Sequence, residues 1–207
     1  MYIDLTFAVQ GTQPIPADHG YALYGAISRL LPEVHQENGI AVHPIRGQSI
    51  GDRRMQLMPW SALALRVEDG KVAPLLTLAG KSLDLNGAKL RVGVPVVRAL
   101  IPATAVRSRL VIIKVAHTDA HSLTAELFTT AARKQLDELG TAREAVLTVP
   151  PDRRRTMALK HKEIVGYEVI VEGLTAEESI TLQERGIGGK RHMGCGVFVA
   201  VGRSAAY

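Results

Sequence analysis

The apolar residues of this chain pass through the same order of strands and helices twice, and this repetition limits the fold more than any other feature. In the first half, alternation over residues 1–9 predicts a half-buried strand, and helical spacing over 18–31 predicts a helix. We expect Asp18 to be the N-cap and Pro32 to mark the helix end. The remaining elements expected are strands over 40–43, 62–67 and 89–97 and a short helix over 68–79. This order is β-α-β-β-α-β.

The second half repeats that order without visible sequence identity to the first. The expected strands cover residues 109–115, 145–149, 156–161, 165–171 and 197–201, and the expected helices cover 123–139 and 175–183. Thr175 and Glu178 have the spacing of a capping box at the start of the last helix. Two such units in tandem predict an α+β protein built from two ferredoxin-like (RRM-like) domains. We place these domains at residues 1–103 and 104–207, the second carrying a C-terminal glycine-rich loop.

Charge content indicates the kind of partner, and cysteine content indicates the cellular compartment. The chain has 25 Lys and Arg against 20 Asp and Glu, a net charge of +5, which favours a polyanion such as nucleic acid. One cysteine excludes an internal disulfide and fits a reducing cytoplasm. No apolar run reaches the roughly 18 residues of a membrane span. The start of the chain also lacks the pattern of a secretory signal, so we expect a cytoplasmic protein without membrane contact.

The segment GIGGKRHMGCGVF, Gly186 to Phe198, concentrates glycines and cations. A dinucleotide-binding GxGxxG would need glycine where Arg191 stands, and it would follow a strand rather than a helix. The nearest P-loop-like sequence has Leu75 in place of its first glycine. His192 and Cys195 lack a second pair of metal ligands, so we expect no metal and a small, buried cysteine.

Two interpretations of this segment remain open. Glycine lets backbone N–H groups face outward and lets a phosphodiester chain approach closely. In that interpretation the RNA- or phosphate-contacting residues of the loop are Gly186, Gly188, Gly189, Lys190, Arg191 and His192. In the other, the segment is a tight turn whose glycines serve packing and whose charges are solvated.

Two motifs resemble known families. The pattern G-x-G-x5-G-x-G-x-F, formed by Gly186, Gly188, Gly194, Gly196 and Phe198, resembles the signature of the RAMP superfamily. The stretch IPADHGYALYGAISRLLPEVH resembles the opening helix of CRISPR repeat-processing endoribonucleases, which leads to a catalytic histidine. The C-terminal stretch SITLQERGIGGKRHMGCGVF is most similar to the small Myxan-type branch of these enzymes.

The resemblance implies a cytoplasmic, metal-independent ribonuclease without a cofactor. It would cut a CRISPR precursor transcript within its repeats to give guide RNAs, leaving a 5′-hydroxyl and a 2′,3′-cyclic phosphate. Because the 2′-hydroxyl of the RNA attacks, the protein supplies a base, an acid and positive charge. The implied partners are the precursor and the mature guide RNA, while effector-complex subunits and a homodimer remain open.

Histidine suits the proton transfers because its ordinary pKa lies near neutrality. His35, just past the first helix, is the first candidate, at the place where the family's catalytic histidine commonly lies. His19 is the second, with helix capping or packing as its alternative role. His43 is a third, with a bland strand-edge position as the alternative, and Arg46 is a candidate for stabilising transition-state charge. Where the family has a catalytic tyrosine this chain has Ser28, so a tyrosine role is doubtful.

Aromatic residues make up only 4% of the chain and no RNP1 pattern is present, so recognition should depend on phosphates and shape. Outside the loop, the basic candidates for RNA contact are Arg53, Arg54, Arg107, Arg109, Arg153, Arg154, Arg155, Lys160 and Lys162. For each cluster the alternative is a solvated face. Arg153–Arg155 opens the expected second-half hairpin and would suit an arm that grips a duplex backbone.

Two other functions compete with the ribonuclease. A non-catalytic RAMP subunit would hold a finished guide RNA inside an effector complex. A metabolic ferredoxin-like enzyme would bind a small phosphorylated ligand. Cleavage of repeat RNA separates the ribonuclease from the first alternative, and tight, salt-sensitive RNA binding separates it from the second.

Overall fold

The computed structural model describes residues 1–32, 34, 39–140, 142–160 and 162–202. Its described residues divide into two compact units, unit 1 over Met1–Ala99 and unit 2 over residues 100–202. This division lies close to the predicted boundary after residue 103. Among the described residues, no helix combines the length and the apolar character needed to cross a membrane.

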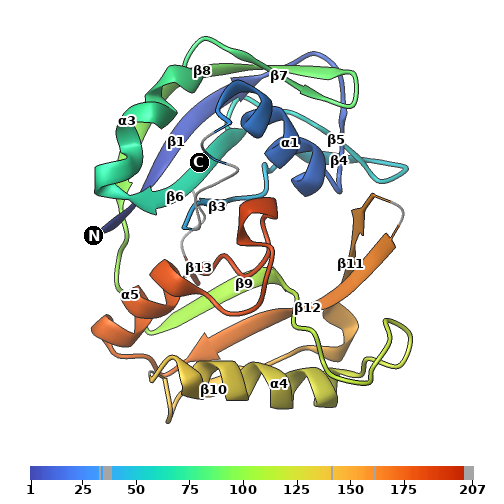
Figure 1. Cartoon of the computed structure of the whole chain (residues 1–207), viewed down its shortest axis with the longest axis vertical. Helices are drawn as coiled ribbons and strands as arrows, with labels where there is room; N and C mark the ends of the chain where they lie inside the picture. Colours follow the sequence, from blue (N-terminus) through green and yellow to red (C-terminus); the bar gives the residue numbers. More distant parts are fainter. Residues whose placement is uncertain (33, 35–38, 141, 161, 203–207) are drawn as a thin grey trace. The chain divides into compact units, whose positions relative to one another are not determined.

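Unit 1 is built on an antiparallel sheet in the order β3-β6-β1-β8-β7 (Figure 1). These strands are β1 (Tyr2–Gln10), β3 (Ala41–Val42), β6 (Ala62–Glu68), β7 (Ser82–Leu85) and β8 (Ala88–Ala99). The helices are α1 (Gly20–Leu30) and three short turns in place of the predicted helix over 68–79, η1 (Asp69–Lys71), α3 (Val72–Leu75) and η2 (Leu76–Leu78). The order is that of a ferredoxin-like unit, with β7 added at one edge.

The apolar pattern of β1 explains why this strand lies in the middle of the sheet. Leu5 and Phe7 are completely buried, which contributes roughly 1.5–3 kcal/mol for each side chain. The prediction of a half-buried strand is wrong, however, because Asp4 and Thr6 on the other face of β1 are buried as well. Asp18 is not the N-cap of α1: His19 occupies that position, without a capping side-chain hydrogen bond.

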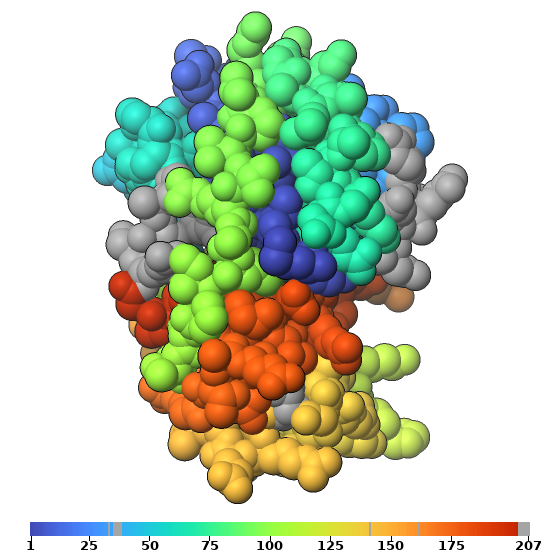
Figure 2. All heavy atoms as spheres, turned by 90° about the vertical axis from the view of Figure 1, so that its left-hand side faces the viewer, coloured from blue at the N-terminus to red at the C-terminus, as the bar shows by residue number. Residues whose placement is uncertain are grey.

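Residues 44–60, which show no clear pattern in the sequence, contribute two strands to a small second sheet in unit 1. Its strands are β2 (Ile15–Pro16), β5 (Arg54–Gln56) and β4 (Gln48–Gly51), in that order. Asp52 and Arg53 have positive φ and form the turn of the β4–β5 hairpin. Figure 2 shows another face of unit 1, on which β8 runs beside β1.

Unit 2 has the sheet order β10-β12-β9-β13, with β11 also paired to β12 (Figure 1). The strands are β9 (Ala105–Val111), β10 (Val146–Thr148), β11 (Arg154–Leu159), β12 (Lys162–Glu172) and β13 (Val199–Ala200). The helices are α4 (Ala125–Glu138) and α5 (Ala176–Arg185), with short 3-10 turns η3 (Pro151–Arg153) and η4 (Arg191–Met193). The predicted order of elements is therefore confirmed here too, and the capping box of Thr175 and Glu178 is present.

β12 forms hydrogen-bonded pairs in two parts of unit 2. Its first half pairs with β11 to make a hairpin arm, and its second half pairs with β10 and β9 in the main sheet. The register shifts between Tyr167 and Val169, where the two halves meet. The core of unit 2 lies on the Tyr167 side, where the ring of Phe128 from α4 packs 5.1 Å from the Tyr167 ring.

Candidate active site

His19 is a buried residue with both ring nitrogens occupied by the backbone. The Ile45 amide donates to Nε2 over 3.0 Å, so Nδ1 carries the proton and donates to the Pro16 carbonyl over 2.9 Å. The ring is 1% exposed. This environment favours the packing role and not proton transfer, because neither nitrogen is available to a substrate.

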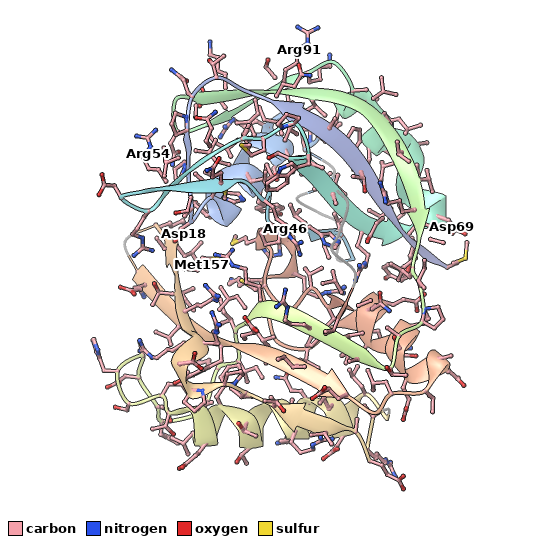
Figure 3. All side chains as sticks on the ribbon, turned by 180° about the vertical axis from the view of Figure 1, so that it is seen from behind. Asp18, Arg46, Arg54, Asp69, Arg91 and Met157 are labelled. Atoms are coloured by element: carbon pink, nitrogen blue, oxygen red, sulfur yellow. The ribbon has the colours of Figure 1, made fainter. Side chains whose placement is uncertain are left out.

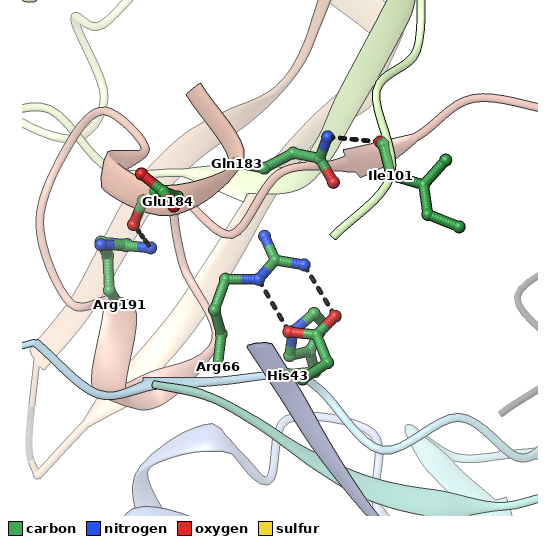
Figure 4. Close-up of polar contacts among 7 residues, drawn as sticks. His43, Arg66, Ile101, Gln183, Glu184 and Arg191 are labelled. Carbon is green, nitrogen blue, oxygen red and sulfur yellow. Dashed lines mark hydrogen bonds and ion pairs between the residues drawn. The ribbon is translucent and has the colours of Figure 1, made fainter. Parts of the chain in front are cut away.

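His43 lies just after β3 in a buried polar cluster with Asp4 and Arg66 (Figure 4). Arg66 donates from Nε and Nη2 to the two oxygens of Asp4 over 2.8 and 2.9 Å. His43 Nε2 lies 3.3 Å from Asp4 Oδ1. Asp4 and Arg66 are directly opposite on β1 and β6, so the antiparallel register itself brings the pair together. His43 therefore follows the edge strand of the sheet, as in the alternative interpretation, but its side chain is buried.

The cluster sets the charge of its members. Burial lowers the pKa of His43, and the opposing effect of Asp4 only partly offsets this, while Arg66 and Arg46 add to the lowering. His43 is therefore neutral near pH 7 and donates its Nε2 proton to Asp4. Burial alone would raise the pKa of Asp4, but His43 and Arg66 outweigh it and hold the pKa of that carboxyl well below its usual range.

Arg46 is an exposed residue close enough to lower the pKa of His43. Figure 3 labels it together with Arg54, which lies on the β4–β5 hairpin. The carbonyl of Arg46 accepts a hydrogen bond from Ser61 Oγ over 2.6 Å, so its backbone is fixed. His35, the first catalytic candidate, lies outside the described residues, and so does His161.

The glycine-rich loop of unit 2 is packed backbone against backbone. Gly186, Gly188, Gly194 and Gly196 all have positive φ, between 62° and 89°. A Cβ atom on Gly186 would clash with the Gly196 carbonyl, and one on Gly196 would clash with the Ile187 carbonyl. Gly189 is different, because a Cβ there would meet nothing within 4 Å. A Cβ atom on Gly188 would likewise clash with the Ile112 carbonyl, so close packing requires glycine at these three motif positions whether or not RNA binds.

Three glycine amides of the loop are hydrogen-bonded within the protein and do not face outward as the phosphate-binding interpretation requires. Gly188 donates to the Gln135 side chain over 2.7 Å, Gly189 to the Ile112 carbonyl over 2.8 Å, and Gly196 to the Leu110 carbonyl over 2.8 Å. The strand expected over 109–115 ends at Val111, and the Ile112 carbonyl just beyond it accepts the Gly189 amide of the loop instead of pairing with a neighbouring strand.

The cations of the loop differ in their surroundings. Arg191 donates from Nη2 to the Glu184 carbonyl over 2.7 Å, at the C-terminal end of α5 (Figure 4). Lys190 adopts a left-handed conformation, and its carbonyl accepts the amides of Met193 and Cys195. His192 is half-buried within η4. Cys195 is 1% exposed, as expected for a small packing residue.

Two further predicted RNA-contacting residues of unit 2 meet at one carboxylate. Glu168 on β12 has one oxygen 3.9 Å from Arg107 Nη1 on β9 and the other 3.8 Å from Arg155 Nη2 on β11. Because Arg107 is opposite Ile170 and Arg155 is opposite Gly166, these side chains share the sheet face that lies away from the Tyr167 core. Two cations with one carboxylate leave this cluster of three side chains with a net positive charge.

The remaining basic candidates lie on the hairpins. Arg53 is exposed at the β4–β5 turn, and Arg54 donates to the Pro14 carbonyl over 2.8 Å. Arg153 lies 3.5 Å from Asp152. Arg154 donates to the Ala120 carbonyl over 2.6 Å. Lys160 is exposed at the end of the β11–β12 arm, and Arg109 is exposed on β9.

Sequence reasoning missed the residues whose roles depend on register. Asp4, Arg66 and Glu168 each seem ordinary in the sequence, and only strand pairing reveals the cluster and the bridged arginines. The available signal was a charge inside an apolar strand, since a buried charge needs a partner. No group of three or more His, Cys, Asp or Glu side chains suited to a metal occurs within the described ranges.

Two ferredoxin-like units in tandem, with a glycine-rich loop before the last strand, define a protein of the RAMP class. A family model described as Cas6 Crispr matches residues 3–203. This chain belongs to the Cas6 family.

Individual relatives agree with this assignment. The CRISPR-associated endonuclease Cas6 of Myxococcus xanthus (strain DK1622) is 38% identical over 205 residues, covering 99% of this chain and 84% of that protein. The resemblance to RAMP proteins of the Myxan type is thus confirmed.

Solved structures confirm the fold. A structure of a CRISPR associated protein Cas6 has a TM-score of 0.71 at 15% identity, covering 97% of this chain and all of that one. A Cas6-related protein from Pyrococcus furiosus has a TM-score of 0.70 at 16% identity, covering 98% of this chain and all of that one. A RAMP protein that binds different RNA substrates has a TM-score of 0.66 at 14% identity, covering 95% and 98%. The predicted α+β class with tandem ferredoxin-like folds is therefore correct.

Proposed function

We propose that this chain is a metal-independent endoribonuclease that cuts CRISPR precursor transcripts within their repeats to give guide RNAs. The observation that carries the proposal is the 38% identity, over nearly the whole chain, to the Cas6 endonuclease of Myxococcus xanthus. The basic hairpins and the net positive cluster of Arg107, Glu168 and Arg155 in unit 2 support an RNA substrate. A chain with one cysteine cannot form an internal disulfide, which suits a reaction in the cytoplasm.

The reaction begins with attack by a ribose 2′-hydroxyl on the adjacent phosphorus. The bond to the 5′-oxygen of the next nucleotide breaks, leaving a 2′,3′-cyclic phosphate on one fragment and a 5′-hydroxyl on the other. A base removes the 2′ proton and an acid protonates the departing oxygen, so the proton count balances. All the protein must add is proton transfer, positive charge and correct orientation.

We assign proton transfer to His35. The support comes from its place in the motif and from the surroundings of the other two candidates. Both ring nitrogens of His19 are hydrogen-bonded to backbone groups. His43 is buried beside the Asp4 carboxylate, and breaking that contact would cost free energy. We keep Arg46 as the group that stabilises the phosphorane, because its position is exposed while its backbone is fixed.

The test is cleavage of labelled repeat RNA in EDTA. The wild-type protein should cut the RNA once, and a 2′-deoxy substitution at the cut site should block the reaction. His35→Ala should lose cleavage while keeping RNA affinity and melting temperature. His19→Ala and His43→Ala should lower the melting temperature, with activity falling in proportion to the folded fraction. If the wild-type protein binds repeat RNA and never cuts it, the chain is a non-catalytic subunit instead.

A further inference from the structure

Trp60 is the only tryptophan of the chain and lies on the surface of unit 1, in the segment between β5 and β6. Its side chain is 48% exposed. A tryptophan has much apolar area and is usually well buried in a folded protein. An indole left in solvent on a small domain therefore needs a reason.

The exposure does not come from a loose loop. Ser61, the next residue, is 1% exposed and uses all of its polar groups. Its amide donates to the Met58 carbonyl over 2.8 Å, its carbonyl accepts the Val9 amide over 3.1 Å, and its hydroxyl accepts the Met58 amide over 2.9 Å. Pro59, the residue before Trp60, has its φ angle fixed by its ring. The backbone that carries the indole is thus held on both sides.

The same turn is joined to the cationic residue of the proposed site. The Ser61 hydroxyl donates to the Arg46 carbonyl over 2.6 Å, so the backbone of Arg46 lies against the turn that presents Trp60. Arg46 is exposed like Trp60. An exposed aromatic ring and an exposed arginine on two hydrogen-bonded segments are suited to binding single-stranded nucleotides, because the ring can stack on a base and the cation attracts the phosphate.

The cleavage chemistry requires a surface that can hold an unstacked base. The attacking 2′-oxygen must line up with the departing 5′-oxygen, and regular A-form stacking does not allow that alignment. A nucleotide near the cut must therefore leave the helical stack, and the protein has to hold its base. We propose that Trp60 stacks on an unpaired base of the repeat RNA, with Arg46 beside it. This inference rests on the proposed function and adds a base-binding residue to it.

Because the chain has one tryptophan, its emission reports on Trp60 alone. The experiment titrates the full chain with repeat RNA that carries a 2′-deoxy substitution at the cut site, and follows tryptophan emission together with the anisotropy of a label on the RNA. Emission should be quenched with the same midpoint as the anisotropy change. Trp60→Leu should weaken binding by about 5- to 150-fold, and Trp60→Phe should restore most of it. Leu76→Ala, at another exposed apolar residue of unit 1, should leave affinity unchanged.

An abasic scan of the RNA then separates stacking from general contact. Removing one particular base should weaken binding to the wild-type protein and have no effect on binding to Trp60→Leu. RNA binding with unchanged emission, wild-type affinity in Trp60→Leu, or equal effects of every abasic site on both proteins would overturn the inference and leave the ribonuclease intact. Failure of the wild-type protein to bind repeat RNA would overturn both.

Discussion

Gly186 and Gly196 pack so closely that a Cβ atom on the first would overlap the carbonyl oxygen of the second. Both also have positive φ, of 62° and 65°. Packing and backbone conformation within the protein therefore require glycine at both positions, in the segment that leads from α5 to the last strand.

Substituting alanine at Gly186 or Gly196 should lower the free energy of unfolding by about 1–3 kcal/mol or more, because left-handed strain and a backbone clash add. Gly189→Ala is the matched control, with open space around the new methyl group, and should change stability by less than about 0.5 kcal/mol. Urea unfolding of the three variants checks this. Equal losses in all three would contradict the packing explanation.

The buried pair of Asp4 and Arg66 should behave as one unit. Arg66→Met leaves an uncompensated carboxylate in the core and should cost about 3–5 kcal/mol. Asp4→Asn in the same chain should recover much of that loss, because no buried charge remains. A double-mutant cycle in urea measures the coupling, and simple addition of the two single losses would count against it.

Stability should depend on pH through His43. Burial lowers the pKa of His43 from 6.5, so below that pH the unfolded chain takes up a proton that the folded protein does not. The free energy of unfolding should therefore be fully present above pH 6.5 and fall as the pH decreases, by at most about 1.4 kcal/mol per pH unit.

His43→Asn should flatten the curve in this range, since asparagine does not titrate. His121→Asn, at an exposed position, should keep the wild-type slope. The measurement is urea unfolding at several pH values between 5 and 8. An unchanged slope in His43→Asn would assign the dependence to another group.

RNA affinity should respond to charge on the hairpin arm and not to charge elsewhere. Lys160→Gln removes an exposed cation at the end of the β11–β12 arm, and the slope of log affinity against log salt should fall by roughly 0.7–0.9 if that lysine meets a phosphate. Lys134→Gln on α4 makes the same change of charge beside Glu138 and should keep the slope. Identical slopes in both variants would remove the arm from the RNA-binding surface.

Local patterns predicted the elements of this fold, because each needs only a few neighbouring residues. The capping box of Thr175 and Glu178 and the strand ahead of the first helix are examples. The β4–β5 hairpin over residues 48–56 escaped prediction because its strands are short, with no apolar alternation to reveal them.

The candidate site was harder to predict, since its properties come from pairs far apart in the chain. Asp4 has the pattern of a solvent-facing residue until β6 places Arg66 opposite it. In the same way, the glycine-rich loop suggested free amides, and only the fold shows that Leu110 and Ile112 accept them. Composition indicates the kind of chemistry, whereas register decides which groups are free to perform it.

The long strand β12 of unit 2 belongs both to the hairpin arm and to the main sheet. The backbone of β12 continues from the arm into the main sheet, and the register shift at Glu168 marks where the arm meets the sheet. Glu168 lies between Arg107 on β9 of the main sheet and Arg155 on β11 of the arm. The base of the hairpin is therefore joined to the main sheet twice, through the continuous backbone of β12 and through this shared carboxylate.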